Sequence, residues 1–410
     1  MNLNKKTKMI IAGLGIYLIS TGISFTVFAW PGEGLGLLRP TDQQVEQTEE
    51  SELSASVFTG PKTGECPLNG VFYPEDQKKA WEEKRPLVVM IENHEDSRPQ
   101  SGLSRADLVY EAVAEGGITR FVAVFYCQAT EPATRKYELG PVRSARTYFL
   151  DWASEYSDYP LYVHVGGAGL CNDPTVDNRA KALCQIDRYG WKDADHHSDM
   201  DQFALSYHSC RREPDRTGEK RATEHTMYCD SKDLWEVAID RDLAAKGESG
   251  DQWDEDFIAW SFKEEEKADK RGDVSSIAFD FWEGYKAYAV SWQYDQASNR
   301  YLRSNGGVPH KDFLTDEQLA AKVVVIQFAQ ETGPVDEHKH MLYKTIGTGK
   351  ALVFQDGQAI EARWSKKTRV SRTIFTDVRG QEIKFNRGQM WIEVLPTGNQ
   401  VSYDESGKSA

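Results

Sequence analysis

Residues 9–30 form a run without a single charge, MIIAGLGIYLISTGISFTVFAW, and this run restricts the fold of the chain more than any other feature. At about 1.5 Å per helical residue, a segment of this length spans the roughly 30 Å hydrocarbon core of a bilayer. Lys5, Lys6 and Lys8 precede it, which favours a cytoplasmic tail at residues 1–8. We therefore predict a single transmembrane helix, with the bulk of the chain extracytoplasmic and held at the cell membrane.

A cleaved signal peptide is the alternative to this anchor. The small residues around Ala29 satisfy the cleavage rule loosely, but the apolar run is longer than a usual signal-peptide core. Both alternatives export the remaining chain. That remainder has the composition of a soluble domain, because charged residues make up 28% of the sequence and the mean hydropathy is -0.60. A net charge of -15 repels polyanions, so we expect no nucleic-acid partner and no docking on an anionic lipid surface.

Six cysteines also fit an exported protein, since oxidising compartments favour disulfides. They are Cys66, Cys127, Cys171, Cys184, Cys210 and Cys229. Short loops favour pairing Cys171 with Cys184 and Cys210 with Cys229, although the sequence alone leaves fifteen pairings open. At least one disulfide is expected.

The pattern of apolar runs, helical periodicity and turn residues changes along the chain and predicts two folded regions. An α/β domain is expected at 66–245 and a mostly antiparallel β domain at 275–396, because short apolar runs alternate with helical patterns in the first and with turn signals in the second. The other segments are predicted as a disordered linker at 31–65, a charged connector at 246–274 and a flexible tail at 397–410.

Three segments of the first region carry the clearest local patterns. Residues 86–91 read as a buried strand, and residues 106–127 read as two strands broken at Glu115-Gly116-Gly117. The stretch GPVRSARTYFLDWA at 140–153 reads as a turn that leads into an amphipathic helix. Arginines gain little at a helix start, where the backbone already carries partial positive charge, so the pattern suggests an anion at this point.

The segments RPLVVMIENHEDSRPQSGLSRADLVYEAVAEGGITRFVAVF, LGPVRSARTYF, YVHVGG and ATEHTMY resemble the YerB-like family of predicted bacterial lipoproteins. The resemblance covers residues 85–396. It implies a membrane-attached, extracytoplasmic protein with a domain of unknown function followed by its own C-terminal β domain, and it supplies no established activity. The chain departs from the family pattern in lacking a lipobox cysteine near the N-terminus, which indicates a peptide anchor instead of a lipid. It also has TEHTMY where a Pro-His-Asn run is expected.

Glu111 and Glu115 are the candidate catalytic residues, as a general acid or base. On one regular strand they share a face, but four residues at about 3.3 Å each set them about 13 Å apart, which is long for a pair of hydrolytic carboxylates. The alternative is structural. In that case Glu111 is a buried carboxylate paired with an arginine, and Glu115 is a turn residue.

Basic side chains gather near the same strand ends and are the candidate ligand-binding residues: Arg98, Arg120, Arg143, Arg146, His164 and His225. Strand ends are where α/β sheets bind ligands, and arginine forms bidentate contacts with phosphate or carboxylate. We expect Arg143 to face the ligand and Arg146 to be partly structural, reaching back to Glu111. An internal salt-bridge network that holds the loops is the competing interpretation.

We predict neither a metal site nor a cofactor. The segment DADHHSDMD at 193–201, with His208 and His225, offers possible ligands but has no recognised metal-binding spacing, so a polar surface loop is favoured. The leading hypothesis is a membrane-anchored envelope protein that binds a cell-wall glycan or other anionic envelope ligand at an Arg/Glu-lined cleft. A stronger form of this hypothesis is that the protein also processes that ligand. A non-catalytic envelope scaffold or protein-docking module is the rival.

Overall fold

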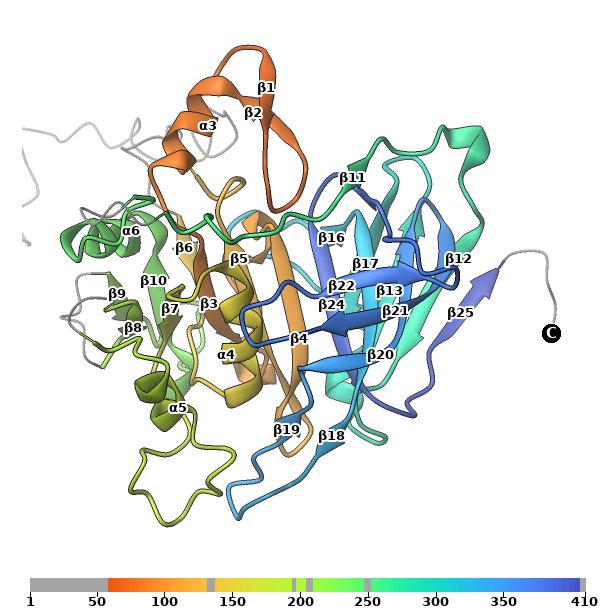
Figure 1. Ribbon diagram of the computed structural model, residues 1–410. Coiled ribbons are helices and arrows are strands. Elements are labelled where there is room, and N and C mark those ends of the chain that lie inside the picture. Colours follow the sequence, from red (N-terminus) through yellow and green to blue (C-terminus); the bar gives the residue numbers. More distant parts are fainter. Residues whose placement is uncertain (1–57, 131–136, 194–196, 204–208, 247–251, 406–410) are drawn as a thin grey trace, which may run out of the picture. The chain divides into compact units, whose positions relative to one another are not determined.

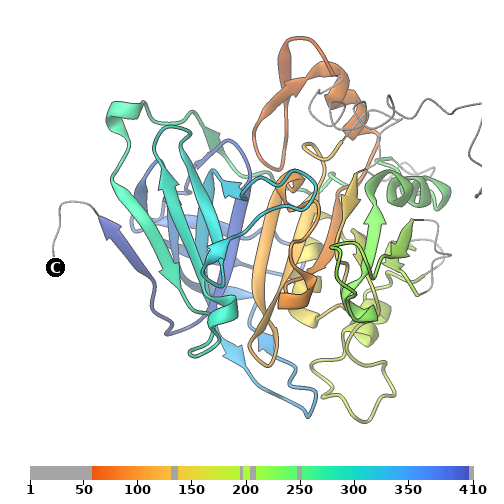
Figure 2. The ribbon, with the colours of Figure 1, turned by 180° about the vertical axis from the view of Figure 1, so that it is seen from behind.

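A computed structural model describes residues 58–130, 137–193, 197–203, 209–246 and 252–405 (Figures 1 and 2). The predicted anchor at 9–30 and the cytoplasmic tail lie outside the described residues, so both stay predictions. Within the described ranges, no helix has the length and apolar character needed to cross a bilayer.

The largest element is a mixed sheet of ten strands. Its order is β22 (Ile374–Asp377), β21 (Gln358–Lys366), β20 (Gly347–Gln355), β17 (Val323–Ala329), β24 (Met390–Pro396), β4 (Leu108–Glu115), β5 (Ile118–Phe125), β3 (Leu87–Glu92), β7 (Leu161–His164) and β8 (Asp199–Asp201). Strand β3 has the sequence LVVMIE and is buried at every position, as expected of a strand covered on both faces.

The predicted hairpin is confirmed. Strands β4 and β5 pair antiparallel across Gly116 and Gly117, which have φ of 54° and 87°. Two successive positive φ values are what a tight hairpin turn requires, and glycine adopts them without strain. A β-bulge between Val113 and Glu115 interrupts the regular pairing just before the turn.

This sheet crosses both predicted regions of the chain. Strand β24, from the C-terminal region, runs parallel to β17 on one side and to β4 on the other. Figure 1 shows the blue C-terminal strands continuing directly into the orange N-terminal strands at this point. Strands before and after the predicted connector at 246–274 therefore belong to one sheet, although their sequences differ in composition.

A second sheet packs on one face of the first. It contains β15 (Val308–Pro309), β14 (Arg300–Asn305), β13 (Val290–Asp295), β12 (Val274–Phe279) and β25 (Ser402–Glu405), with β16 (Ala320–Ala321) paired to β14. All of its pairings are antiparallel, as predicted. Trp292 of β13 meets Trp391 of β24 edge to face, with ring centroids 5.4 Å apart. The teal strands of this sheet are seen most directly in Figure 2.

Helices contribute less than the predicted α/β class implies. They are α3 (Glu75–Glu82), α4 (Thr147–Ala153), α5 (Ala182–Arg188) and α6 (Ser231–Asp240). The helix predicted after GPVRSAR exists as α4, but it is not amphipathic, because Asp151 is its only residue that is not buried. Trp152 stacks on Tyr110 of β4, and Tyr148 packs on Tyr343, so the helix is covered on several sides.

The remaining strands form small sheets: β6 (Glu138–Leu139), β10 (Met227–Asp230) and β9 (Cys210–Arg212) in one; β1 (Lys62–Glu65) with β2 (Phe72–Pro74); β11 (Phe262–Lys263) with β23 (Phe385–Asn386); and β18 (Glu331–Thr332) with β19 (Leu342–Tyr343). Strand β1 lies entirely inside the segment 31–65 that was predicted as a disordered linker, so the end of that segment is an ordered strand. Strand β25 lies in the segment predicted as a flexible tail, where it pairs with β12 and so is held by backbone hydrogen bonds.

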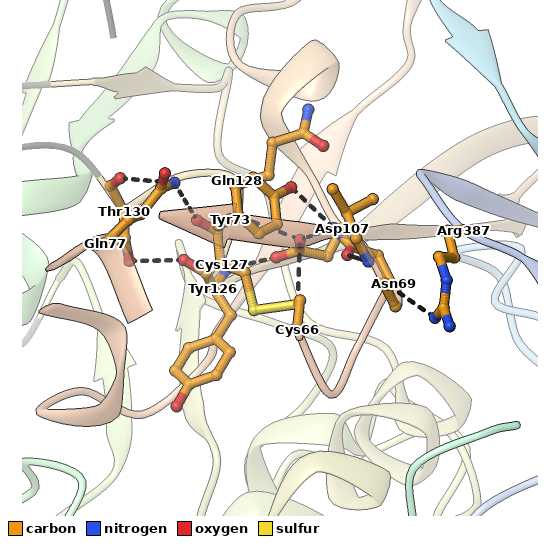
Figure 3. Close-up of a disulfide and its surroundings, with 12 residues drawn as sticks. Cys66, Asn69, Tyr73, Gln77, Asp107, Tyr126, Cys127, Gln128, Thr130 and Arg387 are labelled. Carbon is orange, nitrogen blue, oxygen red and sulfur yellow. Dashed lines mark hydrogen bonds between the residues drawn. A yellow bond between two sulfur atoms is a disulfide. The ribbon is translucent and has the colours of Figure 1, made fainter. Parts of the chain in front are cut away.

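All six cysteines are paired, which confirms the predicted disulfides. Cys171 bonds to Cys184 and Cys210 to Cys229, as the short loops favour. The third bridge joins Cys66 to Cys127 and ties the β1–β2 hairpin to the end of β5. Figure 3 shows Asp107 beside this bridge, where its carboxylate accepts hydrogen bonds from the Asn69 amide and from the backbone N–H of Tyr126.

Candidate functional site

The end of strand β3 brings together residues that are far apart in the sequence. The segment that follows β6 runs beside β3, where Ile91 bridges Val142 and the backbone N–H of Glu92 donates to Pro141. The N–H of Val142 in turn donates to Met227 at the start of β10. Glu92, at the end of β3, therefore lies beside the residues that precede β10.

Four side chains meet here, and we call them the Glu92 cluster: Glu92, His94, Arg143 and His225. The two carboxylate oxygens of Glu92 have different partners. Oε1 lies 3.0 Å from Nε of Arg143, and Oε2 lies 2.9 Å from Nδ1 of His225. The ring of His94 stacks on that of His225, with centroids 4.6 Å apart.

The members of the cluster differ in exposure: Glu92 and His225 are buried beneath, whereas Arg143 and His94 form a solvent-exposed rim. Glu92 is buried, whereas the side chain of Arg143 is 25% exposed and that of His94 is 31% exposed. Nη1 of Arg143 donates to the backbone carbonyl of Glu224, and Nη2 has no acceptor among the described residues. The hydrogen bond with Glu92 raises the pKa of His225, against the opposing effect of burial. The rim therefore presents cationic and imidazole groups to solvent.

Glu115, Arg120 and Arg146 form a second cluster. One carboxylate oxygen of Glu115 accepts from Nη2 of Arg120 at 2.7 Å, and the other accepts from Nη2 of Arg146 at 2.8 Å. Burial alone would raise the pKa of Glu115, but the two guanidinium groups outweigh it and lower this pKa to about 2. Such a carboxylate stays ionised at neutral pH and has no proton to donate.

Arg146 is placed differently from the prediction, because it contacts Glu115 and not Glu111. The bulge in β4 explains the difference, since one extra residue turns the following side chain to the other face of the sheet. Glu115 consequently faces the start of α4, where Arg146 is the residue before the helix. Arg146 itself is not available to an anion, because its side chain donates to Glu115 and to the carbonyl of Ala145.

Glu111 faces the second sheet and has no exposed surface. Its carboxylate accepts from Asn93 at 3.1 Å and from Thr119 at 2.5 Å, and it forms an ion pair with Arg303 of β14, which is also fully buried. Glu393 lies beside this pair, and burial together with the negative charge of Glu111 raises the pKa of Glu393 well above its usual value. The structural alternative for Glu111 is therefore the one that the geometry supports.

Arg98 and His164 complete the set of predicted residues, and the side chain of each is held by neighbouring groups. Arg98 donates to the side chain and backbone of Asn93 and to the carbonyl of Ala287, so it links the end of β3 to the second sheet. His164 is fully buried, with its ring between Asp199 at 2.6 Å and the carbonyl of Gly166 at 2.7 Å. The predicted residues thus divide among several separate clusters.

Sequence reasoning did not single out Glu92, His94 or Arg303. The available signal was the polar run Glu92-Asn93-His94 directly after a fully apolar strand, which is where strand-end sites begin. Arg303 carried no comparable signal, because its partner Glu111 is 192 residues away. Of the segment 193–201, residues 194–196 lie outside the described residues, as does His208.

A concavity of about 960 Å³ lies elsewhere, between the segment after α4, residues 241–243 and 252–258, and the strands β21 and β22. Its mouth carries two apolar side chains with substantial exposure, Ile258 at 60% and Val370 at 40%. Charged residues of both signs line it, and none of the predicted site residues does.

The two regions of this chain match two models of one protein family. The family model described as "Protein of unknown function (DUF3048) N-terminal domain" matches residues 73–244 of this chain. The family model of the corresponding C-terminal domain matches residues 277–392. The chain belongs to this family.

One relative is YerB. Over 334 residues the chain is 28% identical to "Putative lipoprotein YerB" of Bacillus subtilis (strain 168), a match that spans 81% of this chain and 86% of that protein. A crystal structure of the YerB protein from Bacillus subtilis superimposes with a TM-score of 0.63 and 24% identity, covering 82% of this chain and 99% of the other. The YerB-like resemblance inferred from the sequence is confirmed.

Proposed function

We propose that this chain is a membrane-attached, extracytoplasmic binding protein of the bacterial envelope that takes an anionic group of a cell-wall glycan at the Glu92 cluster. The observation that carries the proposal is the state of Arg143. Its guanidinium is held at 3.0 Å by the buried carboxylate of Glu92, yet its side chain remains open to solvent and its Nη2 has no acceptor among the described residues. A positioned guanidinium of this kind suits phosphate or carboxylate.

Membrane attachment and export rest on separate support. The Bacillus relative carries the name "Putative lipoprotein YerB", and three disulfides suit an oxidising compartment. In this chain the uncharged, apolar segment 9–30 is long enough to provide the attachment.

The proposal is binding without acid–base catalysis by the predicted glutamates. Glu111 has no exposed surface through which to reach a ligand. Glu115 is held by two arginines that lower its pKa to about 2, so it is a poor proton donor and a weak base. Arg120 and Arg146 are committed to that same carboxylate. Of the predicted ligand-binding residues, Arg143 and His225 are therefore the ones retained.

The test replaces Arg143 by lysine, which keeps the charge but loses the planar fork. The probes are glucose 6-phosphate and glucuronate, with neutral glucose as the matched control, and binding is followed by NMR shift titration. We expect the wild-type chain to bind the anionic sugars in preference to glucose, and Arg143→Lys to weaken that binding by about tenfold, the equivalent of one good charged contact. The melting temperature should change by less than about 2 °C, because Arg143 is partly exposed.

Arg146→Lys is the control variant. It should lower the melting temperature and leave sugar binding unchanged, since Arg146 serves Glu115. The proposal fails if Arg143→Lys binds the anionic sugars as well as the wild type does, or if glucose binds equally well.

A second candidate function is protein docking, which the exposed Ile258 and Val370 at the mouth of the 960 Å³ concavity favour. A photo-crosslinking residue placed at position 258 or 370 in cells should give one discrete adduct. The same residue at Val378, which is 74% exposed but does not line the concavity, should give none. Equal labelling at all three positions would argue against docking here.

A further inference from the structure

His94, Asp96 and His225 form a group whose ligand atoms all lie within 4.8 Å of one another. His94 and Asp96 belong to the turn around the short 3-10 helix η1 (Glu95–Ser97), and His225 ends η4 (Thr223–His225) just before β10. We propose that these three side chains bind one divalent transition-metal ion of the zinc type. The site shares the Glu92 cluster with the anion proposed above but does not depend on that proposal.

The first argument is the arrangement behind His225. Its Nδ1 lies 2.9 Å from the buried carboxylate of Glu92. With the proton on Nδ1 donated to that carboxylate, the lone pair of neutral His225 is on Nε2, directed away from Glu92. Histidines that bind metals in proteins almost always donate their other nitrogen to a carboxylate or carbonyl in this way, which fixes the tautomer and the ring orientation.

The second argument is the donor set. Two imidazole nitrogens and one carboxylate oxygen are the ligands that zinc and related ions prefer, whereas calcium and magnesium select sites made of oxygen. Three protein ligands also leave a fourth tetrahedral position open to water or to an anion. The other group with metal-like spacing among the described residues, Cys66, Asp107 and Cys127, is excluded because its cysteines form a disulfide.

The third argument concerns which parts must move. Ligand atoms about 2.0–2.2 Å from a tetrahedral ion stand roughly 3.3 Å apart, so the group must contract from its present spacing. The ring of His94 must turn out of its stack on His225. It must also give up the hydrogen bond that Nδ1 of His94 accepts from the backbone N–H of Asp96 at 3.2 Å. Asp96 must leave Arg221, which lies 3.5 Å away.

These movements fall on the residues that are free to make them. The side chains of His94 and Asp96 are 31% and 56% exposed, whereas His225 is 9% exposed and held by Glu92. The backbone behind His225 is fixed by strand β10, which the Cys210–Cys229 bridge fastens to β9. One fixed ligand and two adaptable ones make a site that closes on the ion.

The experiment adds Zn²⁺ or Co²⁺ to chelator-treated protein and measures stoichiometry by calorimetry and the visible absorption of bound Co²⁺. We expect one ion per chain, a tetrahedral Co²⁺ spectrum and a rise in melting temperature with Zn²⁺. His94→Ala should abolish the spectrum and weaken Zn²⁺ binding at least tenfold without lowering the melting temperature of the metal-free protein. Glu92→Gln should weaken Zn²⁺ binding by about 10- to 100-fold, as expected of an orienting carboxylate.

His338→Ala is the matched control, because His338 is exposed and lies outside the group. The proposal is overturned if His94→Ala and His225→Ala bind the ion as the wild type does, or if His338→Ala is equally impaired. The two proposals are also separable. Arg143→Lys should bind the anionic sugar about tenfold more weakly and keep the Co²⁺ spectrum. Asp96→Ala, a change at the one metal ligand outside the Glu92 cluster, should lose the Co²⁺ spectrum and, titrated without metal, bind the anionic sugar as the wild type does.

Discussion

At the scale of single residues, one β-bulge decides what the two glutamates of β4 do. Without it, Glu111 and Glu115 would share a face, as their spacing in the sequence predicts. The register shift after Val113 instead sends Glu111 to Arg303 in the second sheet and Glu115 to the arginines beside α4. Each carboxylate forms ion pairs with buried arginines on its own face of the sheet, so the two glutamates do not form a catalytic pair.

Glu115 should make the protein sensitive to acid. Because its folded pKa of about 2 lies below its unfolded value, the stability it contributes is fully present above about pH 5 and is lost as pH falls toward 2. Glu115→Gln should lower the free energy of unfolding at pH 7 by about 3 kcal/mol, since it leaves two buried arginines without their partner. Urea unfolding between pH 2 and pH 7 measures both effects. The control is Glu219→Gln at a site 75% exposed, which should change neither. An unchanged pH profile in Glu115→Gln would contradict this account.

The limits of sequence reasoning are clearest at this scale. The alternation of β4 and the arginine-rich turn were both visible, and they led to the correct residue types. The bulge was not visible, because no residue in VAEGG distinguishes a regular strand end from a bulged one. The pairing of Arg143 with Glu92 also depends on a tertiary contact, which local patterns do not encode.

At the scale of secondary-structure elements, the hairpin, the central strand β3 and the helix α4 were predictable from pattern and turn chemistry. The burial of α4 was not, because its polar positions are few and the partners that cover it come from distant parts of the sequence. Strand β1 was assigned to a linker for a related reason. Its sequence KTGE has no large apolar side chain, and the strand is held by its pairing with β2 and by the neighbouring Cys66–Cys127 bridge.

Asp107 fastens this hairpin to the start of β4 and should make the attachment depend on pH. Burial raises the pKa of Asp107 to about 7, although four hydrogen bonds to its carboxylate oppose the shift. A folded pKa above the unfolded value means that the associated stability is fully present below about pH 4 and is lost as pH rises through 7.

The measurement compares the wild-type chain with Asp107→Asn from pH 5 to pH 8. Asp107→Asn does not titrate, so the melting temperature of the wild type should fall relative to that of the variant as the pH rises. The variant itself should be less stable at low pH by about 1–3 kcal/mol, because an NH₂ group replaces one of two acceptor oxygens. A difference that stays constant across this range would show that the hydrogen bonds keep Asp107 ionised.

At the scale of the whole molecule, contacts within the large sheet and between the two sheets join the two regions matched by the family models. Glu111 to Arg303, Arg98 to Ala287 and the pairing of β4 with β24 all connect the N-terminal half to the C-terminal half. The predicted boundary near residue 245 came from a real change in composition. Composition reports what a segment contains, however, and not which strand it pairs with.

This continuity predicts a single cooperative unfolding transition. A fragment of residues 66–245 should fail to give dispersed NMR spectra, because β4 would lose β24 and leave Glu111 buried without Arg303. Residues 58–405 should unfold in urea as one unit by both tryptophan fluorescence and circular dichroism. Two separate transitions, or a well-folded fragment, would favour independent domains.

The parallel pairing of β4 with β24 also has a consequence for how the protein is made. Gln389, just before β24, hydrogen-bonds to Leu103, which is 286 residues earlier in the chain. During synthesis the N-terminal half therefore emerges with one strand edge bare, and its neighbour arrives only near the end. Contacts of such long range slow folding, and a bare strand edge invites aggregation. We therefore expect the large sheet of the nascent chain to form only after β24 has been synthesised.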